Sequence, residues 1–115
     1  MSRPLAATAP RRIQLRRTKG WVLPTNTVVA SRPTRWGNPF VEGATSHLGV
    51  SFSAGPLTRR QAIELFRGSI EAQLRDFPDS LAELRGKNLA CWCALNEPCH
   101  ADILLELANA DGATP

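Results

Sequence analysis

The chain has 115 residues and a formal net charge of +4, from 14 lysines and arginines against 10 aspartates and glutamates. This length suits one domain and is too short for two. A content of 43% hydrophobic and 21% charged residues excludes a disordered or fibrous protein. The charge is unevenly placed: residues 1–40 hold eight basic residues and no acid, which leaves −4 for residues 41–115. The eight are Arg3, Arg11, Arg12, Arg16, Arg17, Lys19, Arg32 and Arg35.

Two protein classes are excluded by the distribution of apolar residues and cysteines. No run approaches the ~20 apolar residues that a membrane-spanning helix needs, and the start MSRPLAATAPRR lacks the apolar centre of a secretory signal. The three cysteines are an odd number and lie within nine residues, whereas a disulfide framework spreads an even number along the chain. We therefore expect a cytoplasmic protein with no membrane partner.

The first forty residues predict a tail, two short strands and a shaped loop. Residues 1–10 are rich in Ala, Pro, Ser and Thr without periodicity, which is typical of a flexible tail. Ile13 and Leu15 alternate with polar neighbours, as in a short strand with one buried face. Residues 27–30 are mostly β-branched and predict a second strand. Residues 32–40 hold two prolines, a glycine and an asparagine, which excludes regular structure and favours a loop of defined shape.

The next segments predict a flexible loop and a long helix. Residues 41–57 are mostly small and polar, and His47 has no partner at metal-ligand spacing, so we interpret it as incidental. Thr58 and Gln61 have the spacing of a capping box, so a helix is expected to begin there and to end before Pro78. Its buried side should carry the apolar residues that recur at every fourth position, Ala62, Phe66, Ile70 and Leu74.

The C-terminal third predicts a helical turn, a strand and a second helix. Residues 80–85 suit one more helical turn closed by Gly86, and residues 88–93 suit a buried strand. Asn96 is placed to cap a last helix with Pro98 in its first turn. Three apolar residues would form the buried side of that helix, Ile103, Leu104 and Leu107.

Alternating strands and helices predict an α/β or α+β fold. We expect one small globular domain over residues 11–110, with a three- to four-stranded sheet and two main helices, between tails at 1–10 and 111–115.

The densest chemical signal lies between Cys91 and Asp102. Side chains alternate along a strand, so Cys91 and Cys93 should leave the same face, with Trp92 pointing the other way into the core or toward a ligand. Cys99 and His100 would fall in the first turn of the last helix, where free N–H groups and the helix dipole favour a thiolate or an anion. Open α/β sheets also bind ligands beyond the carboxyl ends of their strands.

Three interpretations of this cluster stay open. The first is a zinc site formed by Cys91, Cys93, Cys99 and His100, because thiolates and imidazole are the ligands that zinc prefers. Its spacing is unfavourable, since adjacent residues on a helix point about 100° apart. The second is a reactive Cys99 with a lowered pKa, assisted in proton transfer by His100 or Asp102. The third is that the buried cysteines serve only as small hydrophobic residues.

The loop at residues 32–40 is a second candidate site. Arg32 and Arg35 could bind phosphate bidentately, and the indole of Trp36 could stack on a base. Gly37 would permit close backbone approach, and Asn38 offers a donor and an acceptor. The alternative is a solvated basic face with a tryptophan that belongs to the core.

Four motifs occur together in this chain: RTKGW at 17–21 with Pro24, RP at 32–33 leading to WGNPF at 36–40, CWC at 91–93, and CHAD at 99–102. With this combination the sequence resembles one small bacterial and phage family, catalogued as domain of unknown function 4326. The resemblance covers roughly residues 12–109, and it implies that the WGNPF loop and the cysteine segment form one site and that residues 41–57 are variable. It implies no activity.

The sequence thus favours a site for a phosphate-bearing ligand: a nucleotide, a nucleoside derivative or a nucleic-acid end. A nucleotide- or nucleic-acid-modifying enzyme would use Cys99 as nucleophile or His100 as acid or base. The alternatives are a non-catalytic nucleic-acid-binding module closed by structural zinc, and an interaction protein whose cysteines are only core.

Overall fold

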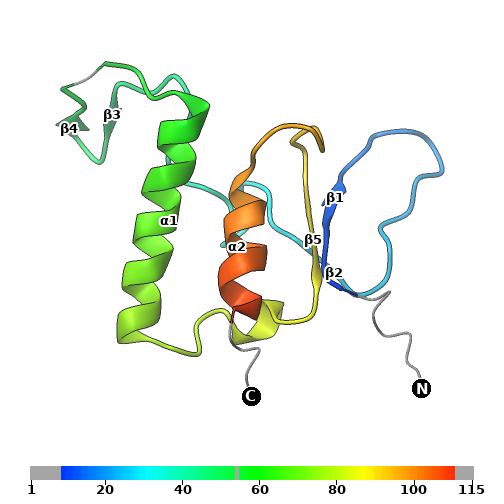
Figure 1. Cartoon of the computed structure of the whole chain (residues 1–115). Coiled ribbons are helices and arrows are strands. Elements are labelled where there is room, and N and C mark those ends of the chain that lie inside the picture. Colours follow the sequence, from blue (N-terminus) through cyan, green and yellow to red (C-terminus); the bar gives the residue numbers. More distant parts are fainter. Residues whose placement is uncertain (1–8, 54, 111–115) are drawn as a thin grey trace.

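A computed structural model describes residues 9–53 and 55–110 and shows a parallel three-stranded sheet beside two helices (Figure 1). The sheet has the strand order β1-β5-β2. The elements of this layer and of the helices are β1 Arg12–Gln14, β2 Thr27–Val29, β5 Asn88–Cys91, α1 Arg59–Asp76 and α2 His100–Asn109. Residues 1–8 and 111–115, where the sequence predicts tails, lie outside the described residues.

The central strand β5 is the most buried part of the sheet. Leu89, Ala90 and Cys91 are buried, whereas every residue of β1 and β2 is half-buried. Both outer strands run parallel to β5, and Ala90 is the register partner of Ile13 on one side and of Val29 on the other. Parallel pairing puts the carboxyl ends of all three strands at one edge, so the segments that follow them start close together.

The helices form successive layers on the sheet. Helix α2 packs against β5 and β1, and α1 packs against α2 (Figure 1). The predicted capping box is confirmed, because the Thr58 hydroxyl accepts from the Gln61 N–H at 3.1 Å and the Gln61 side chain accepts from the Thr58 N–H at 2.9 Å. The four-residue stripe is confirmed as well: three of its residues are buried and the fourth is partly buried against the core.

Helix α2 begins later than the sequence predicts. Cys99, not Asn96, is its N-cap, and Pro98 precedes the helix instead of lying in its first turn. Asp102 completes a capping box by accepting from the Cys99 N–H at 3.1 Å. A thiol is a poor capping acceptor, with an Ala101 N to Cys99 Sγ distance of 3.5 Å, so a sequence-based prediction chooses the asparagine.

Two other segments differ from expectation. Strand β5 ends at Cys91, which leaves Trp92 and Cys93 in the bend that follows it. Within the predicted flexible loop at 41–57, the structure has a short antiparallel hairpin of β3 Ser46–His47 and β4 Val50–Ser51.

The helical turn predicted near residues 80–85 is confirmed as a 3-10 helix, η2 Ala82–Leu84.

The result is one α+β domain whose core lies between β5 and the two helices. None of the helices in the described residues is long and apolar enough to cross a membrane.

We predict that Leu89→Ala destabilises the protein by about 2–5 kcal/mol, because it empties a fully buried site in the central strand. The matched control, Val22→Ala, removes methyl groups from a residue that is 78% exposed and should cost about 0.5 kcal/mol or less. Urea unfolding measures both values, and equal losses would contradict the placement of β5 at the core.

Candidate functional site

A cavity of about 360 Å³ opens where the carboxyl edge of the sheet meets the N-termini of both helices. Its wall combines the segment after β2, the bend after β5 and the starts of α1 and α2. The residues with polar or reactive side chains on this wall are Ser31, Arg32, Asn38, Glu42, Arg59, Cys91, Trp92, Cys93, Cys99 and His100. The cavity therefore brings together the two segments that the sequence singled out.

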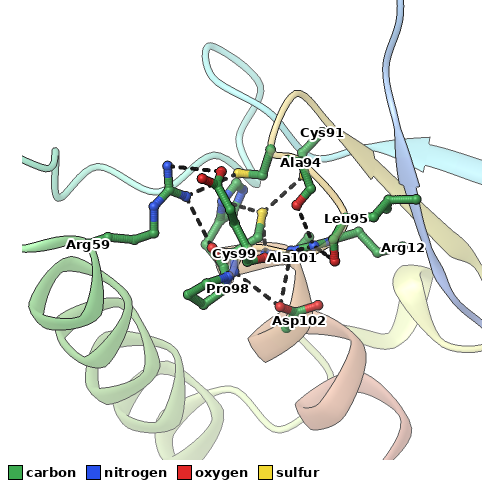
Figure 2. A network of polar contacts seen from close by, with 12 residues as sticks. Arg12, Arg59, Cys91, Ala94, Leu95, Pro98, Cys99, Ala101 and Asp102 are labelled. Carbon is green, nitrogen blue, oxygen red and sulfur yellow. Dashed lines mark hydrogen bonds and ion pairs between the residues drawn. The ribbon is translucent and has the colours of Figure 1, made fainter.

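All three cysteines converge on this wall. Their Sγ atoms lie within 4.8 Å of one another, and the Cys91 and Cys99 sulfurs are 3.0 Å apart (Figure 2). Cys91 and Cys99 are each only 1% exposed, while Cys93 is half-buried. Three thiols at these distances form a cluster that is close enough to bind a metal ion.

The thiol cluster does not contain the activated Cys99 that one interpretation requires. The hydrogen bond between Cys99 and Cys91, together with burial, raises the pKa of Cys99 to about 11. The same hydrogen bond lowers the pKa of Cys91. The helix N-terminus predicted a lowered pKa for Cys99, and that prediction is wrong because the neighbouring thiol and burial outweigh the helix dipole.

His100 lies beside the cluster rather than inside the group of mutually close ligand atoms. Its Nε2 is 2.6 Å from the Ala30 carbonyl oxygen, and its Nδ1 is 3.6 Å from Cys99 Sγ. A carbonyl only accepts, so Nε2 carries the proton and the Nδ1 of a neutral ring keeps a lone pair directed toward Cys99. The Phe66 ring packs edge-on against the imidazole at 5.4 Å and fixes its orientation further.

Arg59, in the first turn of α1, forms the cationic side of the cavity. Its Nη1 lies 3.8 Å from Cys93 Sγ and donates to the Pro98 carbonyl at 3.1 Å (Figure 2). Glu42 and Glu97 lie 3.6 Å from other nitrogens of the same guanidinium. Arg59 thus connects α1 to the turn between Cys93 and Cys99.

Arg12, from β1, holds that turn from the opposite side (Figure 2). Its side chain is only 7% exposed. Nη2 donates to the carbonyls of Ala94, Leu95 and Glu97 at 2.8–2.9 Å, and Nη1 donates to the Asp102 carboxylate at 3.1 Å. This one guanidinium therefore fixes the backbone that separates the second thiol from the third.

Asp102 is occupied by this network. It accepts from Arg12 and from the Cys99 backbone N–H, and it does not contribute to the cavity wall. The proton-transfer role suggested for Asp102 therefore has no geometric support.

The WGNPF loop divides between the cavity and the core. Arg32 and Asn38 line the cavity, where Arg32 Nη1 donates to the Asn38 carbonyl at 2.6 Å. Trp36 is 6% exposed and belongs to the core. Arg35 lies away from the cavity, with its guanidinium 4.4 Å from the Trp36 ring centroid and 3.3 Å from Glu83. Of the five residues predicted as one ligand-binding set, Arg32, Arg35, Trp36, Gly37 and Asn38, only Arg32 and Asn38 line the cavity.

Gly37 and Asn38 give the loop its shape. A Cβ at Gly37 would lie 2.8 Å from the Arg32 backbone, so the close approach is between two parts of the loop. The buried Asn38 side chain donates to the Ala62 carbonyl at 3.2 Å and accepts from the Phe40 N–H at 2.8 Å. Asn38 thereby fixes the loop to α1.

Four polar residues of the site were not found from the sequence: Arg12, Ser31, Glu42 and Arg59. Arg12 has the pattern of a solvated basic stretch, and nothing local distinguishes it from Arg11. For Arg59 the sequence offered one signal: it is a basic residue directly after the N-cap Thr58, where the helix dipole disfavours positive charge. His47, interpreted as incidental, packs against Phe40 with ring centroids 4.5 Å apart.

A family model, described as a domain of unknown function (DUF4326), matches residues 13–110. The chain belongs to this family. A search of the curated proteins and a search of the solved structures each gave no match. The match to the DUF4326 family spans all the segments that line the cavity, and the resemblance found in the sequence is confirmed.

We predict that Arg12→Met lowers the free energy of unfolding by about 3 kcal/mol or more, because it leaves three carbonyls and a carboxylate without their donor. Arg35→Met breaks an exposed ion pair and should cost about 0.5 kcal/mol. Urea unfolding compares the two variants, and equal effects would mean that the Arg12 network contributes no stability.

We also predict that iodoacetamide modifies the metal-free protein first at Cys93. This thiol alone among the three is part-exposed, whereas Cys99 stays protonated until the pH approaches its pKa of about 11. Peptide mass spectrometry at pH 7.5 and pH 9 reports the order of modification. Rapid alkylation of Cys99 at pH 7.5 would contradict the geometry.

Proposed function

We propose that this protein binds a zinc ion through Cys91, Cys93 and Cys99, and that a phosphate-bearing ligand occupies the cavity beside that ion. The observation that carries the proposal is the convergence of three thiols on a cavity wall that also presents two guanidinium groups.

The donor set supports zinc. Thiolates are preferred ligands of this ion, and a tetrahedral site with Zn–S bonds of about 2.3 Å separates its sulfurs by about 3.8 Å. The three sulfurs already lie within 4.8 Å of one another, and one pair is at 3.0 Å. Only small side-chain adjustments are therefore needed to accept the ion.

The fourth ligand position decides what kind of zinc site this is. His100 Nδ1 lies 3.6 Å from Cys99 Sγ, and its other nitrogen is held by a backbone carbonyl, as is usual for a metal-binding histidine. A small shift of the sulfurs toward Nδ1, with the ring kept in place, would complete a closed, structural Cys3His site. If His100 stays beside the cluster, the fourth position faces the cavity and remains open to a ligand or to water, as in catalytic zinc sites.

Charge and donors support an anionic ligand. Arg32 is exposed, and it donates one Nη1–H to the Asn38 carbonyl. A guanidinium has five N–H donors, so the remaining ones can bind phosphate oxygens. Arg59 adds a second guanidinium on the same wall, where Glu42 and Glu97 share its charge, so Arg32 is the main cation for the ligand. The ligand classes that suit these groups are a nucleotide, a nucleoside derivative or a nucleic-acid end.

If the zinc site is open, the function it favours is that of an enzyme that modifies nucleotides or nucleic acid. A non-catalytic nucleic-acid-binding module with structural zinc is the second candidate, and the nearly complete burial of Cys91 and Cys99 favours it.

The purified protein is expected to hold about one zinc ion per chain, measured by inductively coupled plasma mass spectrometry. Cobalt substitution should give the thiolate-to-cobalt absorption of a three-sulfur site, and Cys93→Ser should weaken that absorption and remove stoichiometric zinc. Ser31→Ala, which changes another residue of the same wall, serves as the control and should retain the metal. A zinc-free protein with no cobalt absorption would refute the metal site.

His100→Ala separates the two kinds of site. Loss of zinc together with the fold is expected of a closed Cys3His site. Retention of zinc, with access of a small anion such as cyanide to the cobalt-substituted centre, identifies an open one.

We predict that adenosine 5′-monophosphate binds in the cavity and that Arg32→Ala weakens its affinity about 10- to 100-fold, since a charge-assisted hydrogen bond to phosphate is lost. Arg35→Ala is the matched control, because Arg35 pairs with Glu83 away from the cavity. Isothermal titration calorimetry measures both variants. Equal affinities would refute the role assigned to Arg32.

A further inference from the structure

The side chain of Trp92 is not packed into the core of the fold. It follows the central strand directly, yet it is 46% exposed, whereas the core tryptophan Trp36 is 6% exposed. The sequence predicted that Trp92 points either into the core or toward a ligand, and the structure excludes the core. Because Trp92 also lines the cavity, its exposed aromatic surface is available to a ligand bound there.

One side of the indole is already covered by a cation. The Arg17 guanidinium lies 4.5 Å from the centroid of the Trp92 ring. Arg17 belongs to the segment that follows β1, so this contact joins the carboxyl ends of β1 and β5. A cation on one face holds the ring in place and leaves the remaining exposed surface for a second planar group.

The chain positions this ring next to the thiols. Trp92 lies between Cys91 and Cys93, and all three residues line the same cavity. A planar group stacked on Trp92 would therefore border the same cavity as the thiol cluster, Arg32 and Arg59. A nucleoside phosphate suits this arrangement, with a flat base at one end and an anionic group at the other.

The surroundings of Trp92 are positively charged. Arg16, Arg17 and Lys19 are exposed in the segment after β1, and residues 9–41 contain no aspartate or glutamate. Arg17 places its charge directly against Trp92, where it would attract the phosphates of a strand that continues beyond a bound terminal nucleotide.

We propose that Trp92 is the stacking platform for the base of a nucleoside phosphate, held between the ring and the arginines of the cavity. This inference rests on the proposed function, because it assigns the base-recognition part of the same ligand. The shared ligand chemistry is a nucleoside 5′-phosphate, supplied either as a free mononucleotide or as the 5′ end of a single strand.

The test compares three probes on the zinc-loaded protein: ribose 5-phosphate, adenosine 5′-monophosphate and a 5′-phosphorylated single-stranded hexanucleotide. Trp92→Leu is expected to weaken binding of adenosine 5′-monophosphate roughly 5- to 100-fold and to leave binding of ribose 5-phosphate unchanged, because stacking acts on the base alone. Trp92→Phe should retain most of the affinity. Quenching of tryptophan fluorescence by the nucleotide should disappear in Trp92→Phe.

Leu95→Ala is the matched control, since it removes an exposed apolar side chain from the same turn without altering the cavity wall. Its affinities should equal those of the original protein, and circular dichroism should confirm that every variant is folded.

The outcomes separate this inference from the proposed function. Equal affinity for ribose 5-phosphate and adenosine 5′-monophosphate, both lowered by Arg32→Ala, would overturn the stacking role and leave the phosphate site intact. Binding of none of the three probes would overturn both. A Trp92-dependent affinity that is higher for the hexanucleotide and falls with salt assigns the site to a strand end, and equal affinity for the two nucleotide probes assigns it to a mononucleotide.

Discussion

The nearly buried guanidinium of Arg12 joins the parts of the molecule on which the site depends. It comes from β1 and donates to three carbonyls in the turn after β5 and to the carboxylate that caps α2. A buried charge is tolerated only where hydrogen bonds replace its water, and here the peptide carbonyls provide most of that replacement. The turn consequently has a fixed shape, and that shape sets where Cys93 and Cys99 lie relative to the end of the strand. Because Arg12 holds the turn on one side and Arg59 on the other, the thiol cluster is positioned by two arginines that do not belong to it.

The cavity follows from parallel pairing. With β5 between β1 and β2, three segments leave the same edge of the sheet. The segment after β1 contributes the Arg17 guanidinium, and the segment after β2 contributes the shaped loop with Arg32 and Asn38. The end of β5 and the bend after it contribute thiols and Trp92. Helix α2 adds His100, whose orientation is fixed by a carbonyl at the end of β2 and by a phenylalanine of α1. The contacts that stabilise the fold are thus the contacts that orient the candidate ligands.

Local patterns predicted the elements well, and the site only in part. The α1 capping box and stripe were correct because they depend on spacing along one helix. The α2 N-cap was wrong because a thiol caps poorly by itself, and Cys99 takes that position only with Asp102 and Arg12 around it. The direction of the Cys99 pKa shift was also not predictable from the sequence. The position of Cys99 at a helix N-terminus can be read from the sequence, but the partner thiol at 3.0 Å, which raises the pKa, cannot. The sequence left open whether Trp36 belongs to a ligand site or to the core and did not distinguish Arg35 from Arg32, and only packing separated core from cavity.

The sequence by itself determined the class of fold, the existence of both helices and of the buried strand, the start of α1, the family, and the two segments that form the candidate site. These depend on periodicity, on capping and on residue types that are close in the chain. The tertiary structure alone decided that the two segments share a cavity, that three thiols converge with His100 beside them, and that Arg12 and Arg59 hold the turn between them. The arginine contacts join residues more than thirty positions apart, and the convergence of the thiols depends on how the chain turns between Cys91 and Cys99. The charge asymmetry shows the same division: the sequence located eight cations in the first forty residues, and folding gave Arg12, Arg17 and Arg32 three different roles.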